Sequence, residues 1–220
     1  MYWTVQYCPS KSVPMRPASQ ERQQRMFAAA RDLFFTRGYR VSMDAVAHYA
    51  GVSKQTVYAH FGSKEGLFRA VVDDFLGPQR ASLDPDSADL AATLNEFALI
   101  HLRQAAEPRA LAAGRILLAE AQRFPREAQA LFTAGAEAVL QPLAECLRRA
   151  MQRSELRCDD PAAAAELLLG MLNGLDMDRQ RFGLPGRSDE TQISAWTHRA
   201  VAAFLRAYAP ESKHRARKTP

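Results

Sequence analysis

Two short helical segments separated by a single glycine constrain this chain more than any other feature. Apolar residues recur at helical spacing over residues 43–50, and Gly51 follows directly. A glycine at that point can adopt the left-handed conformation that ends a helix. Ser53 can then cap a second helix over residues 54–60, in which Val57 faces inward and most other side chains are polar. Most of the surface of the second helix is therefore free to contact something other than a hydrophobic core.

Two short helices joined by Ala-Gly-Val-Ser are typical of a helix-turn-helix, whose second helix enters the major groove of DNA. Gln55 can bond adenine through two atoms, Thr56 can contact a thymine methyl group, and Lys54 can reach guanine or a phosphate. Neighbouring polar residues are placed for the DNA backbone. On periodicity alone, two ordinary helices with a solvated polar face remain the alternative. The candidate DNA-binding residues are Arg22, Arg25, Ser42, Ser53, Lys54, Gln55, Thr56, Tyr58, His60 and Lys64.

The distribution of charge favours the DNA-binding interpretation. The 220-residue chain carries a net charge of +5 and is long enough for one large or two small domains. Residues 1–69 contain ten Lys or Arg and four Asp or Glu, whereas residues 70–210 contain fifteen and nineteen. We therefore expect the N-terminal part to dock on phosphates and the middle of the chain to serve another purpose.

The run RQQRMFAAARDLFFTRGYRVSMDAVAHYAGVSKQTVYAHFGSKEGLF resembles the N-terminal domain of TetR-family transcriptional regulators. The later segments LLAEAQRFP and DDPAAAAELLLGMLNG resemble the C-terminal domain of the AefR-like subgroup. The resemblance implies a dimer that binds a palindromic operator and is released by a small molecule. It also implies that the helix after the helix-turn-helix transmits the signal. Gln55 departs from the Gly, Pro or Ala that many members carry, so the operator sequence cannot be copied from a relative.

Helical periodicity continues along the rest of the chain, and we predict an all-α fold with two domains. A flexible arm (1–19) precedes a three-helix DNA-binding domain (20–66), a helical effector-binding and dimerisation domain (67–209) and a basic tail (210–220). The helix that begins after Ser63 is expected to end at Gly77-Pro78, before a loop. Pro142 is expected to kink or split the helix over residues 126–153. Whether translation starts at Met1 or Met15 stays open.

Two C-terminal apolar stripes suggest a dimer interface. One lies after the helix start Asp160-Pro161 and is flanked by Gly170 and Gly174, small residues that allow close approach of another helix. The other occupies residues 190–208. The alternative is that both helices close the core of one protomer. The candidate interface residues are Leu168, Leu172, Leu175, Trp196, Ala200, Val201, Phe204 and Tyr208.

A helical domain of this size can enclose a pocket for a small, largely apolar or aromatic effector. Taken singly, most candidates for its lining fit a plain core position better than a pocket. His101 and Asn173 are the stronger candidates, because polar groups on apolar faces need a partner. The predicted lining consists of Phe97, His101, Gln104, Leu117, Leu118, Phe124, Phe132, Met171, Asn173 and Met177.

Signatures of catalysis and of metal or cofactor binding are absent from the sequence. The chain lacks a phosphate-binding glycine loop, H-E-x-x-H and G-x-S-x-G, and its three cysteines and five histidines lack metal-ligand spacing. We expect no enzyme, cofactor or metal, and a cytoplasmic protein without a membrane span. Two other functions stay open: an effector-independent activator, and a small-molecule binder or enzyme that keeps the helix-turn-helix as scaffold.

Overall fold

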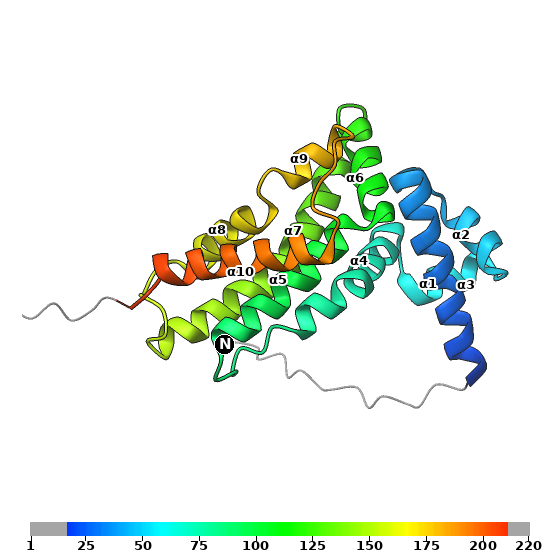
Figure 1. The fold of residues 1–220 in the computed structure, drawn as a ribbon. Coiled ribbons are helices and arrows are strands. Elements are labelled where there is room, and N and C mark those ends of the chain that lie inside the picture. Colours follow the sequence, from blue (N-terminus) through cyan, green and yellow to red (C-terminus); the bar gives the residue numbers. More distant parts are fainter. Residues whose placement is uncertain (1–16, 211–220) are drawn as a thin grey trace, which may run out of the picture.

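The computed structural model describes residues 17–210, and every regular element in that range is helical (Figure 1). The predicted all-α fold is therefore confirmed. Most of the predicted N-terminal arm and basic tail lie outside the described residues, and residues 17–19 of the arm belong to the first helix. None of the described helices is long and apolar enough to cross a membrane. The elements are α1 (Pro17–Arg37), the 3₁₀ turn η1 (Gly38–Arg40), α2 (Met43–Ala50), α3 (Lys54–Phe61), α4 (Lys64–Ala81), α5 (Leu90–Ala106), α6 (Pro108–Ala121), α7 (Pro125–Gln152), α8 (Pro161–Asn173), α9 (Asp176–Arg181) and α10 (Glu190–Ala207).

The first three helices and the start of α4 share one hydrophobic core, which we call the head core. Its centre is formed by Met26 of α1, Val57 of α3 and Leu67 of α4, each fully buried. Two edge-to-face aromatic pairs connect α1 to the later helices: Phe27 with Phe61, and Phe34 with Phe68, both with ring centroids 5.2 Å apart. Helix α3 is thus held by packing against α1 and α4.

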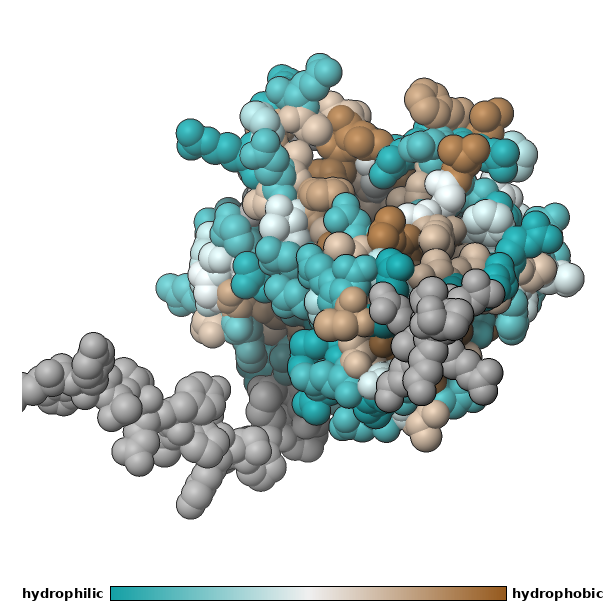
Figure 2. Space-filling model, turned by 90° about the vertical axis from the view of Figure 1, so that its left-hand side faces the viewer, coloured by the Kyte–Doolittle hydropathy of each residue, from teal (hydrophilic) through white to brown (hydrophobic). Residues whose placement is uncertain are grey.

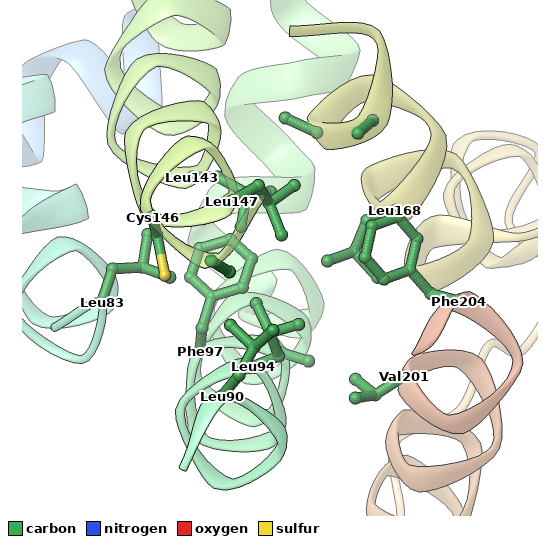
Figure 3. Packing of buried hydrophobic residues seen from close by; sticks show 14 of the residues in the cluster. Leu83, Leu90, Leu94, Phe97, Leu143, Cys146, Leu147, Leu168, Val201 and Phe204 are labelled. Atoms are coloured by element: carbon green, nitrogen blue, oxygen red, sulfur yellow. The ribbon is translucent and has the colours of Figure 1, made fainter. Parts of the chain in front are cut away.

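A second core occupies the C-terminal part of the chain, between α5, α7, α8 and α10 (Figure 3). Phe97 of α5 and Phe204 of α10 are completely buried there, and Leu143 and Leu147 of α7 pack against them. Cys146 lies in the same core, and burial raises the pKa of its thiol to about 11. This helical bundle is the larger of the two described cores.

Helix α4 extends further than predicted. It runs through Gly77-Pro78 to Ala81 instead of ending there. Proline removes one helical N–H, which normally ends or bends a helix. Here tertiary contacts hold the last turns: Gln104 donates from Nε2 to the carbonyl of Phe75 at 2.6 Å, and the Gln79 side chain, 1% exposed, bonds to His101 of α5. The head core is thus joined to the C-terminal bundle by one unbroken helix.

Two further features concern α7, where one of the two predicted effects of Pro142 is ruled out, and α9. Pro142 does not split the helix around it, because α7 is one helix of 28 residues. Its neighbours Val139 and Leu143 are buried in the C-terminal core, which holds both sides of the proline in helical register. The short helix α9 was not predicted, since its six residues carry almost no apolar periodicity.

The head contacts the bundle at a second place, between α1 and α6. Gly38 has a φ of +65°, and a Cβ at this position would lie 2.5 Å from Cγ2 of Ile116 in α6. Arg109, at the start of α6, donates to Asp32 of α1 at 3.1 Å. Figure 1 shows α6 beside α1, on the side of the head away from α3. A shift of α6 would therefore directly displace the helices of the head core.

Most of the predicted dimer-interface residues belong to the protomer core, which corrects that assignment. Six of them are at most 5% exposed and pack within the C-terminal core: Leu168, Leu172, Ala200, Val201, Phe204 and Tyr208. A side chain already buried by its own chain has no surface left for a partner. Trp196 also packs inward, donating from Nε1 to the carbonyl of Leu172 at 2.8 Å. Only Leu175, which is 65% exposed, faces outward.

Candidate DNA-binding surface and effector pocket

Two serine caps shape the helix-turn-helix. The Ser42 side chain accepts a hydrogen bond from the backbone of Ala45, Ser53 accepts one from Thr56, and both distances are 3.1 Å. Gly51 adopts the left-handed conformation, with φ 65° and ψ 39°, and ends α2. These local features fix the angle between α2 and α3 before any DNA is bound.

The outward face of α3 is polar and exposed. Gln55, Tyr58 and His60 are exposed, while Val57 is completely buried against the head core. Thr56 is half-buried, and its hydroxyl lies 2.8 Å from that of Ser53, so the hydroxyl serves the helix cap. Gln55 therefore stands as the exposed amide on this helix, with the geometry needed to bond a base edge.

Lys54, the first residue of α3, is engaged by an acid that the sequence reasoning did not identify. Its Nζ lies 2.8 Å from Oδ2 of Asp44 in α2. The hydrogen bond that Lys54 donates to this carboxylate raises the pKa of Lys54. The pair is exposed, with 52% and 63% of the two side chains accessible, so water and salt weaken it. A phosphate or base that approached Lys54 would therefore compete with Asp44 for its ammonium group.

Basic and aromatic side chains surround the turn. Arg25 of α1 is exposed, and its Nη1 is 3.9 Å from the position that a Cβ on Gly51 would take. Arg22 is also exposed on α1, and Lys64 is half-buried at the start of α4. Tyr49, near the end of α2, is 63% exposed and was missed by the sequence analysis. The available signal in the sequence was an aromatic residue two positions before the turn glycine.

The predicted effector-pocket residues differ widely in burial and lie on several of the described helices. Phe97 is completely buried in the C-terminal core, whereas Leu118 and Phe132 are 51% and 69% exposed. Leu117 of α6, Phe124 at the start of α7 and Met171 of α8 are half-buried. The exposure of Leu118 and Phe132 argues against an enclosed site at these two side chains, and the pocket lining stays a prediction. Helical periodicity does not distinguish an apolar face turned to a core from one turned to solvent.

A small pocket does lie between α5, α8, α9 and the start of α10, with an empty volume of about 310 Å³ that includes its open mouth. It contains two of the predicted residues, Asn173 and Met177. Its polar members are Asp176, Gln180 and Arg187, which lie in segments without helical apolar periodicity. The remaining lining residues are Leu102, Ala105, Ala106 and Ile193.

His101 connects this pocket to α4. Its Nδ1 lies 3.0 Å from Oε1 of Gln79, and its Nε2 lies 3.0 Å from Oδ1 of Asn173. Burial lowers the pKa of His101, which favours the neutral ring. A neutral imidazole has one N–H, so it donates to only one of the two amide oxygens. The other amide satisfies the second ring nitrogen when it is rotated so that its NH₂ group faces the ring. The result is a polar chain from α8 through α5 to α4, which we call the 79–101–173 relay.

The titratable side chains of the described residues are not arranged as a metal site. In the range 17–210, no group of three or more His, Cys, Asp or Glu is placed to hold a metal ion. Burial favours the neutral form of His101, and its bonds to two amides suit a structural connection better than proton transfer. The two surfaces of interest are therefore a binding face on α3 and a pocket in the bundle.

Comparison with known proteins matches both parts of the chain. Residues 27–71 match the bacterial regulatory proteins of the tetR family, and residues 92–210 match the C-terminal domain of AefR-like transcriptional repressors. The HTH-type transcriptional regulator AlkX of Mycobacterium tuberculosis is 33% identical over 107 residues, which cover 46% of this chain and 51% of AlkX. The chain thus matches about half the length of that curated relative.

Two solved structures share the whole architecture. A TetR-family transcriptional regulator from Mesorhizobium loti is 27% identical, with a TM-score of 0.70 and coverage of 89% of this chain and 100% of that one. The flavonoid-responsive regulator FrrA is 31% identical, with a TM-score of 0.66 and coverage of 88% and 100%. Together with the capped helix-turn-helix and the helical bundle behind it, these matches establish that the chain belongs to the TetR family of transcriptional regulators and carries an AefR-like C-terminal domain.

Proposed function

We propose that this protein is a transcriptional repressor that binds a palindromic operator as a homodimer and leaves it when a small molecule occupies the C-terminal bundle. The observation that carries the proposal is the exposed polar face of α3, which is capped by Ser53 and anchored by the buried Val57. A short helix with this division of faces is typical of a major-groove reader. The AefR-like repressor match supports the negative sign of regulation.

In this proposal Gln55 reads a base edge, and the other predicted contacts position the helix. Tyr58, His60 and Lys54 face the groove or its phosphates from α3, and Arg22, Arg25 and Lys64 contact the backbone from the flanking helices. Ser42 and Ser53 act mainly as helix caps, with their backbone N–H groups near the phosphates. Phosphate contacts make affinity strongly dependent on salt, whereas the base contact gives specificity.

A dimer would join two such heads through the outward faces of α8 and α10. Leu167 of α8 is 52% exposed, and the exposed Gly170 one turn later leaves open space around its α-carbon. On α10 the exposed Ala195 and Ala202 also lie on one stripe. Figure 2 shows hydrophobic residues among hydrophilic ones on one face of the molecule, the left-hand side of Figure 1. Small residues beside an exposed leucine suit a helix from a second copy.

Release of DNA would require the effector to favour a spacing of the two heads that does not match the operator. Half-sites are about 34 to 36 Å apart, so a small tilt of each head suffices to break the match. A coupling of about 1 to 3 kcal/mol is typical of such control. Both connections to the head, the continuous α4 and the α1–α6 contact, originate in the bundle. The flavonoid-responsive neighbour FrrA supports the response to a small molecule.

The proposal is tested by fluorescence anisotropy with an operator obtained by selection from random duplex DNA. The full chain should bind the selected duplex more tightly than a scrambled one, and the affinity should fall steeply as salt rises. In a reporter strain, expression from a promoter that contains the operator should fall when the protein is present. Increased expression would show that the protein is an activator. Equal binding to the selected and the scrambled duplex would contradict sequence-specific regulation.

A further inference from the structure

We infer that Gly77-Pro78 forms a hinge inside α4, and that His101 and Gln104 of α5 are positioning residues that hold this hinge at one angle. The head core contains the first turns of α4, and the hinge lies in its last turns, beside α5 (Figure 1). Where it concerns DNA, the inference rests on the proposed function. The hinge itself is a property of the free chain and is tested without DNA.

Glycine and proline weaken α4 at one point. Pro78 has no N–H to donate to the carbonyl of Asp74, four residues earlier, and its ring crowds the preceding turn. Glycine at position 77 avoids the steric restriction that proline places on the residue before it. Apart from its chain neighbours and the helix backbone, nothing lies within 4 Å of the place that a Cβ on Gly77 would take. The helix can therefore bend here without a clash.

Two residues of α5 hold α4 on either side of the proline, and we call these two contacts the α5 clamp. Before Pro78, the carbonyl of Phe75 accepts from Nε2 of Gln104 at 2.6 Å. After it, the side chain of Gln79 bonds to Nδ1 of His101 at 3.0 Å. Residues 101 and 104 are three apart and lie on one face of α5. That face therefore fixes the direction of α4 on both sides of the proline.

A third contact crosses the proline within α4. Arg80 donates from Nη2 to the carbonyl of Asp73 at 2.8 Å and from Nη1 to its Oδ1 at 3.0 Å. The two residues are seven positions apart, so this side chain spans about two turns and passes Pro78. Side-chain donors on helical carbonyls are typical of a place where the helical hydrogen-bond ladder is interrupted. The pair is 35% and 45% exposed, so water weakens it, and the buried α5 clamp sets the angle.

The Gln104 contact fixes the angle of α4 at little net stabilisation. Its Oε1 is buried and accepts no hydrogen bond from any described residue. Rotating the amide would turn the donor away from the carbonyl of Phe75, so the rotation exchanges one unpaired group for another. The cost of this unpaired oxygen offsets much of the gain from the hydrogen bond. A small change in the bundle therefore suffices to release the clamp.

A bend at Pro78 is large enough to matter for DNA. Leu67, in the head core, lies eleven residues before Pro78, or about 16 Å along the helix. A bend of about 10° displaces it by about 3 Å, close to the rise of one base pair. The contact of Gly38 with Ile116 limits larger movements of the head. In a dimer, a closed clamp would hold the two heads at one spacing, and an open clamp would allow several.

Hydrogen–deuterium exchange of the free full chain tests the hinge by a double-mutant cycle. Q104L should accelerate exchange of the backbone amides of residues 79–82 about fivefold, the factor that one net hydrogen bond supplies. P78A should slow it by a similar factor, because alanine restores the missing N–H. In P78A/Q104L the effect of Q104L should vanish, since a helix without the hinge does not need the clamp. An equal effect of Q104L in both backgrounds would overturn the role of the clamp.

Two control variants separate the clamp from general loosening of the bundle. R103L removes the neighbouring contact from α5 to Glu190 of α10, and P142A removes the proline inside α7. Neither should change exchange at residues 79–82. Urea unfolding of Q104L should lie close to that of the wild type, which shows that the change is local. Acceleration by R103L as large as that by Q104L would contradict the assignment.

The positioning role is measured with the selected operator and with the same duplex carrying one extra base pair at its centre. Q104L should tolerate the insertion about fivefold better than the wild type, at the lower end of usual coupling energies, and P78A should tolerate it less well. All three proteins should bind a duplex with a single half-site alike, a result that general damage to the head would not give. Equal tolerance in Q104L and wild type would overturn the positioning role.

The two measurements separate this inference from the proposed function. If selection yields no operator, the repressor proposal fails, while the exchange cycle still decides whether the hinge exists. If a palindrome is selected but Q104L and wild type exchange alike, the repressor proposal stands and the α5 clamp is wrong.

Discussion

The imidazole of His101 in α5 lies 3.0 Å from the side-chain oxygen of Asn173 at the end of α8, and its other nitrogen lies 3.0 Å from Gln79 in α4. Asn173 also lines the pocket. A change at the pocket wall can therefore reach α4, the helix that enters the head core, through two hydrogen bonds.

The first prediction concerns the protonation of His101. Burial lowers its pKa in the folded chain below the ordinary value of 6.5. As the pH falls below 6.5, the unfolded chain takes up a proton that the folded chain does not bind, so the free energy of unfolding should decrease. The slope is at most about 1.4 kcal/mol per pH unit for this one group.

Urea unfolding between pH 5 and pH 8 measures this slope. H101Q should flatten the profile, and H198Q, which removes an exposed histidine on α10, should retain the wild-type slope. An unchanged profile in H101Q would show that other groups cause the pH dependence.

The second prediction concerns the Asp44–Lys54 ion pair. D44N removes the carboxylate that holds Lys54 and also a negative charge beside α3. DNA affinity should rise for all sequences, and the slope of log affinity against log salt should steepen by about 0.9. Anisotropy titrations at several salt concentrations measure it, with D84N in the α4–α5 loop as the control. Equal affinities for D44N and wild type would mean that Lys54 does not contact DNA.

The third prediction tests the contact between the head and α6. G38A places a Cβ 2.5 Å from Ile116 and forces alanine into a positive φ, which should lower the free energy of unfolding by about 1 to 2 kcal/mol or more. Gly114, inside α6, has open space around it, so G114A should raise stability by up to about 1 kcal/mol. Urea denaturation compares the two. Equal stability of G38A and wild type would argue against a tight α1–α6 junction.

The fourth prediction concerns the proposed dimer face. L167E introduces a charge on the outward face of α8 without touching the core, since Leu167 is 52% exposed. Light scattering after size exclusion should show a monomer, and operator affinity should fall with it. L118E, at a similarly exposed position on α6, should remain dimeric. A dimeric L167E would place the interface elsewhere.

The head was predictable because its structure follows from local rules. Ser42 and Ser53 cap the helices that follow them, and Gly51 adopts the conformation that its lack of a side chain permits. Each of these features depends on residues within four positions in the sequence. The Asp44–Lys54 pair spans ten positions and was not evident from the same rules.

The bundle was less predictable because its features depend on distant contacts. The passage of α4 through Pro78 relies on Gln104 and His101, both from α5. Apolar periodicity located α8 and α10 correctly but could not tell which apolar side chains face the protomer core. The pocket joins α5, α8, α9 and a loop, and no spacing in the sequence links Asp176 to its partner Arg187.

The most direct measurement of the central claim is selection of duplexes from random DNA by wild type and by Q55A. Wild type should enrich a palindrome, and Q55A should lose preference at one symmetric pair of positions, with a cost of about 1 to 3 kcal/mol on the original operator. K64A should instead weaken all sequences alike and reduce the salt slope by about one unit. If wild type enriches no sequence at low ionic strength, or if Q55A behaves like K64A, α3 does not read DNA through Gln55.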